Sequence, residues 1–395
     1  MATNSNSNSE DIAIMATNSN SNGKAARRKP AYAAPPASPE LATLDGILAD
    51  STSPDLLVTN YLEDEAVRHA TLSAKEARDW PLQDGAPYLQ HRELCVFYTR
   101  SDGTPMERND AINQLLHVRE STALTLRIAL GLWNLRRNDQ HLCLNGSAAI
   151  RIEEILAWRG IKKHSRVKGT VRQSDGWQTK DVDAVREDFL LAASFYLRGY
   201  HPIWKRGKWK GRYVVTAPYL RVTFVDREDL WGNEELAGVF VAPGDWINSY
   251  ESAGNYFLTP VDRRVFALNP QNDQHELRIA LFLTERWRKQ AKTRAYGTSI
   301  TMETLLQESV IRVNEKNLTN CFVPRIEQAL AHLHQKGIIG SYHCLNPVDR
   351  SKPRWGNAWL GSQWRILPPD EIITVLERIV RRELPALPLP SPRAA

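Results

Sequence analysis

Hydrophobic and polar positions alternate at helical spacing along Asn317–Tyr342, NLTNCFVPRIEQALAHLHQKGIIGSY. The hydrophobic positions recur every three or four residues: Phe322, Ile326, Ala329, Leu330 and Leu333. Gly337 is a helix-stopping residue, and the β-branched pair Ile338 and Ile339 follows it directly. The pattern therefore predicts one amphipathic helix that runs into a short β-hairpin.

The opposite face of this predicted helix is polar. Its side chains are amides and one guanidinium, which have the hydrogen-bonding geometry of base edges in a DNA major groove. We therefore assign base reading to Asn317, Asn320, Arg325 and Gln328. Amphipathic helices occur in every class of globular protein, so the assignment depends on what surrounds this one.

An internal repeat supplies that context. The sequence Leu126–Leu130, LRIAL, recurs letter for letter at Leu277–Leu281, each time in a predicted helix that continues to a Trp and basic residues. The next predicted helices keep one register, because six positions match at a constant offset of 150: Ile150, Ile152, Glu153, Ile155, Leu156 and Ile161 with Ile300, Met302, Glu303, Leu305, Leu306 and Ile311. The third helices, Asp181–Leu197 and the one in Asn317–Tyr342, correspond only loosely.

Each copy reads as helix, strand, helix, helix and hairpin, the order of a winged helix. For the first copy the predicted wing strands are Ile203–Arg206, Arg212–Thr216 and Leu220–Val225. The fold class is therefore α+β, with two tandem winged-helix domains and a disordered N-terminal tail. The expected boundaries are 1–56 for the tail, 57–225 for the first domain with an N-terminal extension, 226–268 for a breaker-rich linker, 269–383 for the second domain with a C-terminal helix, and 384–395 for a Pro-rich tail.

Basic residues around these helices are candidates for contact with the DNA backbone. In the first domain they are Lys162, Lys163, Arg166, Lys168, Lys180, Arg186, Lys205, Arg206, Lys208, Lys210 and Arg212, and in the second Arg350, Lys352 and Arg354. The third helix of the first domain is acidic, with Asp181, Asp183, Glu187 and Asp188. We interpret the first domain as a backbone grip that also suits protein contact, and the second as the sequence reader.

Three tryptophans, Trp355, Trp359 and Trp364, are interleaved with the basic residues of the second wing. Basic and aromatic residues together suit phosphate contact and base stacking. The alternative is that the three indoles anchor the wing onto its own domain. The sequence leaves both interpretations open.

Composition narrows the class of protein. Of 395 residues, 51 are Lys or Arg and 45 Asp or Glu, so the formal net charge is +6, which is permissive for a polyanionic partner. The four cysteines lie far apart without a CxxC pair, which favours reduced thiols, and no hydrophobic run is long enough to span a membrane. We expect a cytoplasmic protein associated with nucleoid or plasmid DNA, and no membrane partner.

Candidate chemistry is weak throughout. His332-Leu333-His334 matches the His-hydrophobic-His pattern of rolling-circle nucleases, with Tyr342 nearby. That motif requires a strand, because positions i and i+2 of a helix point about 200° apart. A zinc site from Cys321, His332, His343 and Cys344 lacks regular spacing, and phosphate-loop, dinucleotide and nucleophile-elbow motifs are absent from the sequence. We expect no enzyme activity, no cofactor and no metal.

The chain resembles plasmid replication initiators of the theta-replicating Rep class over roughly residues 92–368. The resemblance depends on the two LRIAL segments and on Arg325–Ser341, RIEQALAHLHQKGIIGS. It implies binding to repeated origin sites (iterons) as a monomer, opening of the duplex, recruitment of host replication proteins, and repression of the protein's own gene as a dimer. Two alternatives stay open: a dimeric transcriptional regulator that binds an operator, and a pair of winged helices that serve only as protein-interaction modules.

Overall fold

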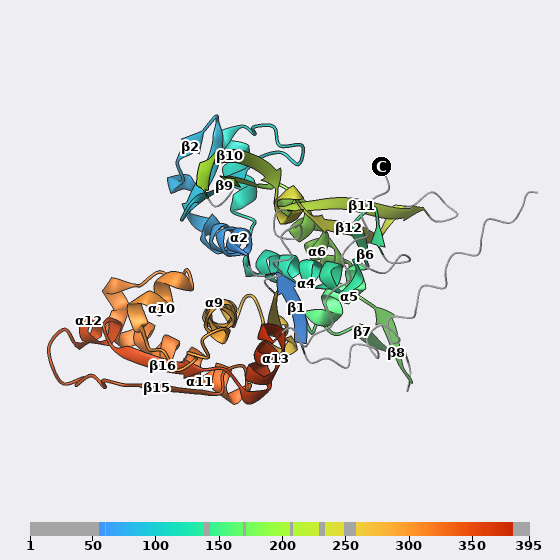
Figure 1. The fold of residues 1–395 in the computed structure, drawn as a ribbon. Helices are drawn as coiled ribbons and strands as arrows, with labels where there is room; N and C mark the ends of the chain where they lie inside the picture. The colour runs from blue at the N-terminus through green and yellow to red at the C-terminus, as the bar shows by residue number, and fades with distance from the viewer. Residues whose placement is uncertain are drawn as a thin grey trace, which may run out of the picture. The chain divides into compact units, whose positions relative to one another are not determined.

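The computed structural model describes residues 55–381, except residue 60 and residues 138–142, 169–170, 206–207, 229–233 and 249–257. Helices and small antiparallel sheets are mixed along this part of the chain, so the α+β class is confirmed. Figure 1 shows the elements in chain order. The predicted tails lie outside the described residues, except that Asp55 and Leu56 begin strand β1 (Asp55–Thr59) and do not belong to a tail.

The second repeat unit follows the predicted order of elements. It consists of α9 (Gln274–Ala291), β14 (Ile300–Thr301), α10 (Met302–Glu308), α11 (Val323–Gln335), β15 (Ser341–Cys344) and β16 (Gln363–Leu367). The three strands form one antiparallel sheet in the order β14-β16-β15. The hairpin is longer than predicted, because the connection between β15 and β16 contains helix α12 (Trp355–Leu360) (Figure 1).

The first repeat unit has the same order of elements, with one extra strand before its second helix and two further strand pairs inserted along the chain. Its elements are α4 (Glu120–Arg136), β5 (Cys143–Leu144), β6 (Ser147–Ile150), α5 (Ile152–Trp158), α6 (Thr179–Ala192), β11 (Leu220–Glu228) and β12 (Glu234–Pro243). Its sheet has the order β11-β12-β6-β5. In both units, therefore, the last strand of the hairpin pairs with the strand that precedes the second helix.

The constant register of the repeat is visible in the second helices. α5 spans Ile152–Trp158 and α10 spans Met302–Glu308, so both ends differ by the predicted 150 positions. The matched side chains of Ile155 and Leu305 are fully buried. Even the left-handed backbone after each helix is shared, at Gly160 (φ +66°) and Val310 (φ +58°). The predicted duplication of this segment is confirmed by these shared bounds.

The hairpin of the first unit differs from the prediction. Strands β9 (Phe195–Lys205) and β10 (Lys208–Pro218) do not form the wing; they extend a separate sheet with β4 (Leu94–Tyr98), β3 (Ala86–His91) and β2 (Leu82–Gln83). The third helix ends at Ala192, not Leu197, because Phe195 already pairs with Tyr98 in that sheet.

The segment 226–268 is correspondingly more than a linker. Strand β12, which lies within it, pairs with both β11 and β6 and so completes the sheet of the first unit. It also contains η2 (Asp245–Ile247), β13 (Leu258–Asp262), which pairs with β1, and α8 (Arg263–Phe266). The prediction was misled because Gly and Pro at strand ends look like linker breakers in sequence.

The remaining elements surround the two units. They are α2 (Leu62–Ser73), η1 (Ala74–Asp79), α3 (Arg108–Leu115), the hairpin β7 (His164–Lys168) and β8 (Val171–Gly176), and α13 (Asp370–Val380). The hairpin replaces the basic loop predicted for 161–173. α13 packs against α9 and β13 through Ile372 and Leu376, as predicted for a C-terminal helix that covers the second domain. In the part of the chain that is described, no helix is long and apolar enough to cross a membrane.

Two ion pairs, one buried and one partly buried, connect the first helices of the two repeat units. Arg127 of α4 bonds to Glu285 of α9, and Arg278 of α9 donates from Nη2 to Glu120 of α4 at 2.7 Å. Arg127 and Arg278 are the equivalent arginines of the two LRIAL segments. Both pairs join residues 158 positions apart, so the two repeats contact each other through the segment they share.

Asp188 holds α6 against α4. It is buried, and its carboxylate accepts hydrogen bonds from the hydroxyls of Thr122 (2.7 Å), Thr125 (2.8 Å) and Ser121 (3.2 Å) and from Arg159 (3.5 Å). Burial raises the pKa of Asp188, and Arg159 with the hydroxyls opposes that rise. Of the acids predicted for this helix, Asp188 therefore does not contribute to an acidic outer surface, unlike the exposed Asp183 and Glu187.

Replacing Asp188 with alanine should lower the free energy of unfolding by about 2–3 kcal/mol, because three hydroxyls and one guanidinium lose their shared acceptor. Asp183→Ala removes an exposed carboxylate from the same helix and should change stability by less than about 0.5 kcal/mol. Urea unfolding of both variants measures the difference. Equal effects would contradict the structural role of Asp188.

Candidate nucleic-acid interface

α11 begins and ends as its sequence dictates. Pro324 occupies its first turn, where a missing N–H costs nothing, and Val323, Ile326, Leu330 and Leu333 form a fully buried stripe. At the C-terminus Gly337 adopts φ +69°, a conformation that favours glycine. The backbone N–H groups of Lys336 and Ile338 then bond to the last turn, each at 2.9 Å, which closes the helix.

All four predicted base-reading residues are exposed. Arg325 and Gln328 lie three positions apart, on neighbouring turns of the outer face of α11. Asn320 lies in the π-helical turn η4 (Leu318–Phe322) that precedes α11, and Asn317 ends the 3-10 turn η3 (Glu315–Asn317). The helix is thus shorter than predicted, but the polar residues still follow one another along its exposed side.

On the exposed face of α11, the charged side chain that forms no ion pair with a described residue is positive. Within the described residues, Arg325 has no acidic partner. The acid of α11, Glu327, is occupied: its Oε1 accepts from Arg350 at 2.5 Å and from the indole of Trp359 at 3.1 Å. Glu327 therefore holds the β15–β16 connection against α11 and is not paired with Arg325.

The basic residues of the β15–β16 connection divide into two kinds. Arg350 is paired with Glu327 and stacks over Trp355 at 5.2 Å, so it orients the connection. Lys352 is 75% exposed and lies 3.9 Å from Asp349, and Arg354 is exposed in a left-handed conformation (φ +58°). Lys352 and Arg354 are consequently the residues of this group with side chains available to phosphate.

The three tryptophans mainly anchor the hairpin of the second unit to its own unit. Trp359 and Trp364 are buried, and their indole N–H groups bond to Glu327 and to the hydroxyl of Ser362, respectively. Trp355 is half-buried under Arg350. For Trp359 and Trp364 the anchoring alternative is confirmed, so neither indole is placed to stack on a base.

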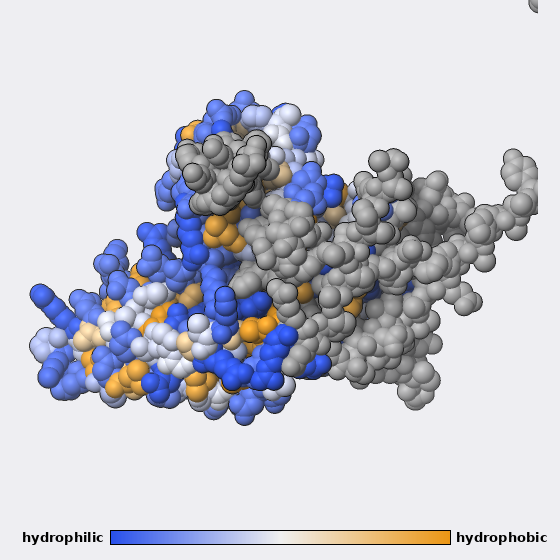
Figure 2. All heavy atoms as spheres, in the orientation of Figure 1, coloured by the Kyte–Doolittle hydropathy of each residue, from blue (hydrophilic) through white to orange (hydrophobic). Residues whose placement is uncertain are grey.

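One basic residue was missed by the sequence analysis. Lys316 is exposed in η3, directly before Asn317, and is not among the predicted base-reading residues. Its position four residues ahead of Asn320 in the sequence could have indicated it. Figure 2 shows hydrophilic residues over much of the face of the second unit, with hydrophobic residues in small groups between them.

The first repeat unit presents a different third helix. Lys180 and Arg186 are exposed on α6, but Asp183, Glu187 and Leu190 are exposed there too. Arg186 lies over the ring of Phe224 at 6.0 Å, and Glu187 pairs with His117 at 3.2 Å. Beside this helix the outer surface is therefore mixed in charge, in contrast to α11.

The remaining predicted backbone residues of the first unit are spread over three segments. Lys162 and Lys163 are exposed after α5, where Lys163 lies 6.0 Å from the ring of Trp177. Arg166 and Lys168 lie in β7, and Lys205, Lys208, Lys210 and Arg212 lie in β9 and β10. Arg206 lies outside the described residues. The β9–β10 group belongs to the separate sheet and not to the hairpin of the first unit, which corrects the predicted wing.

The His-Leu-His segment lies on α11, as predicted. His332 faces Glu276 at 3.2 Å, whereas His334 faces the carbonyl of Ile339 at 3.3 Å and the ring of Tyr342. Leu333 between them is fully buried. The two imidazoles thus have separate partners and do not converge on one point.

The fold and this surface define an α+β protein with two copies of one helix–strand–helix–helix–hairpin unit, the second of which exposes a polar third helix. No protein-family model and no curated protein matches the chain. The solved structure of domain 2 and domain 3 of RctB is similar to it with a TM-score of 0.39 and 13% sequence identity, over 75% of this chain and 97% of that chain. A likeness of this extent does not define a family for this chain.

Proposed function

We propose that this protein binds double-stranded DNA in a sequence-specific manner through two winged-helix modules, with α11 in the major groove. The observation that carries the proposal is the exposed polar side of α11 opposite a fully buried stripe, with Arg325 paired to no carboxylate among the described residues. The three-stranded sheet and the basic connection beside α11 correspond to the wing that contacts the adjacent backbone. No enzyme activity, cofactor or metal is needed for this function.

The role that fits best is replication initiation at repeated origin sites, with repression of the protein's own gene by a dimer. This step depends on the resemblance to theta-type Rep proteins. The second candidate is an operator-binding transcriptional regulator. Direct repeats of ~20 base pairs beside the gene favour initiation, and a single palindrome favours the regulator, because a dimer's symmetry is mirrored in its operator.

For the first unit a protein-interaction role has a specific observation in its favour. The exposed side of α6 carries Asp183, Glu187 and a 53% exposed Leu190, a combination that repels phosphate and suits a protein surface. Host replication proteins or a second copy of this chain are the expected partners.

Selection of bound duplexes from a random pool tests the proposal directly. The full chain should enrich one motif of about 20 base pairs, the length that two modules contact on one face of the duplex. Failure to bind any duplex at low salt would reject DNA binding and leave the protein-interaction alternative.

Lys352→Gln should weaken binding to every duplex alike and reduce the dependence of affinity on salt by about one unit in slope, because it removes one phosphate contact. Lys208→Gln should do the same if the β9–β10 hairpin also contacts the backbone. Titrations by fluorescence anisotropy at several salt concentrations measure both slopes. Lys75→Gln, at an exposed lysine of η1, is the matched control and should leave the slope unchanged.

A further inference from the structure

A group of three metal-ligand side chains lies outside the DNA-binding surface, between α2 and β3. Glu65 and His69 are one turn apart on α2, and His91 ends β3. One ligand atom from each residue lies within 4.8 Å of the other two. The centroids of the His69 and His91 imidazole rings are 4.2 Å apart, and the ring planes are tilted by 32°.

One ring nitrogen of each histidine lacks a hydrogen-bond partner among the described residues. The Nε2 atoms of His69 and His91 are shielded from solvent and form no hydrogen bond with any described residue. His91 Nε2 is 3.8 Å from Glu65 Oε1, beyond hydrogen-bond range. Buried polar atoms without partners cost free energy, and a bound cation would satisfy both nitrogens at once.

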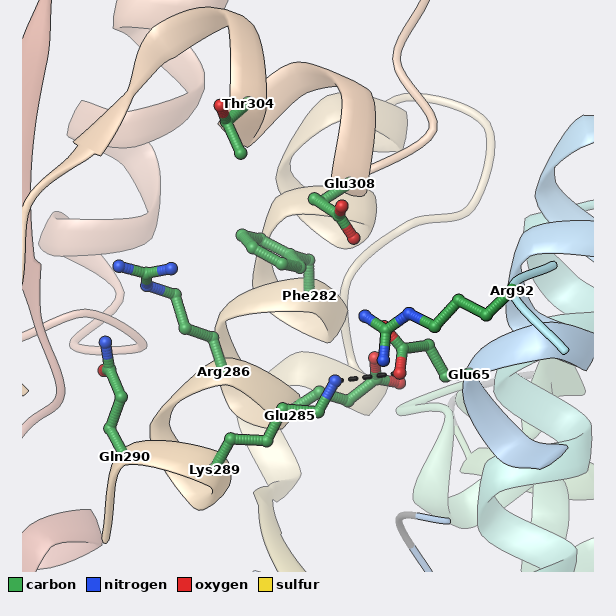
Figure 3. A pocket seen from close by; sticks show the side chains of 9 residues that line it. All are labelled: Glu65, Arg92, Phe282, Glu285, Arg286, Lys289, Gln290, Thr304 and Glu308. Carbon is green, nitrogen blue, oxygen red and sulfur yellow. Dashed lines mark hydrogen bonds and ion pairs between the residues drawn. The ribbon is translucent and has the colours of Figure 1, made fainter. Parts of the chain in front are cut away.

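Two cations compete for Glu65. Arg92 donates to it at 2.9 Å and Lys289 of α9 at 2.8 Å, and Figure 3 shows both side chains pointing toward the carboxylate. Their side chains are 50% and 42% exposed, and the cavity of about 260 Å³ beside them offers room to turn away. A metal ion at Glu65 therefore replaces Lys289 rather than joining it.

We propose that Glu65, His69 and His91 bind one divalent transition-metal ion. Two imidazole nitrogens and one carboxylate oxygen match Zn²⁺ with its fourth position open to water. This proposal is independent of DNA binding. It differs from the expectation from sequence that the protein binds no metal, because His69 and His91 are 22 positions apart in the sequence and show no ligand spacing.

Titration of metal-free full-length protein with Co²⁺, followed by visible absorption, tests this site. We expect the d–d bands to saturate at one equivalent, and Zn²⁺ to abolish them. His69→Phe, which keeps a ring in the same volume, and His91→Phe should each remove the bands. Lys289→Gln should tighten Co²⁺ binding several-fold, because it removes the competing ammonium. This variant leaves the core side chains unchanged, so its effect does not come from altered packing.

His332→Ala is the matched control, because Asp273, Glu276 and His332 form a second group with ligand atoms within 4.8 Å of one another. The Co²⁺ bands should be unaffected by it. Bands that persist in both histidine variants, or that disappear in His332→Ala, would overturn the proposal. So would the absence of stoichiometric binding by the wild-type chain and by Lys289→Gln.

Discussion

Replacing Glu285 with alanine is expected to lower the free energy of unfolding by about 3–5 kcal/mol, the usual cost of removing one partner from a buried ion pair. Glu285 is 2% exposed and accepts from Arg68 Nε at 3.0 and 3.1 Å and from Arg127. Both arginines are themselves buried. The variant would leave two buried guanidinium groups without the carboxylate that they share, and that loss is the reason for the large expected cost.

Chemical denaturation of Glu285→Ala, with Glu303→Ala as an exposed helical control, measures this cost. A second variant separates charge from volume: Arg68→Met and Arg127→Met combined with Glu285→Leu replaces the group by apolar residues and should recover much of the loss. If this triple variant is as unstable as Glu285→Ala, lost packing and not unpaired charge is the cause.

The same ion pairs explain why part of the fold was predictable. LRIAL occurs twice, and the arginine of each copy, Arg127 or Arg278, forms an ion pair at the contact between α4 and α9. The second helices kept their register because their buried positions, such as Ile155 and Leu305, face equivalent cores. Local spacing carries this information, since it reflects which side of a helix is buried.

The errors occurred where the partner is distant in sequence. β9 has the residues of a wing strand, and nothing local indicates that it pairs with β4, about a hundred positions earlier in the chain. Asp188 looks like a surface acid until Thr122 and Arg159 are placed beside it. Likewise, the indole N–H of the buried Trp359 donates to Glu327, which belongs to another element.

For the candidate interface, the sequence indicated which residues of α11 are exposed. It did not indicate which of the basic residues are already held in ion pairs. Arg350 and Arg325 look equivalent as cations, whereas the structure pairs one with Glu327 and leaves the other without an acidic partner among the described residues. A basic residue that a carboxylate holds at hydrogen-bond distance, as Glu327 holds Arg350, is less available to a ligand. That distinction requires coordinates, and it ranks Arg325 first among the predicted base readers.

Arg325→Ala is accordingly expected to relax base preference at one position of the bound site, at a cost of about 1–3 kcal/mol for the preferred base pair. An arginine on a third helix bonds bidentately to guanine, and alanine keeps the helix but loses both bonds. Because Arg325 is exposed and forms no ion pair with any residue that the structure describes, its removal should change stability by less than about 0.5 kcal/mol. Loss of binding can then be attributed to DNA contact and not to unfolding.

Competition between single-base variants of the selected duplex, at one fixed salt concentration, measures the effect. Arg378→Ala, at an exposed arginine on α13 of the same unit, is the matched control and should leave the preference at every position intact. A uniform loss of affinity in Arg325→Ala, with the base profile unchanged, would make Arg325 a phosphate contact like Lys352. An unchanged affinity and profile would remove α11 from the groove altogether, and with it the assignment of Gln328 to the neighbouring base pair.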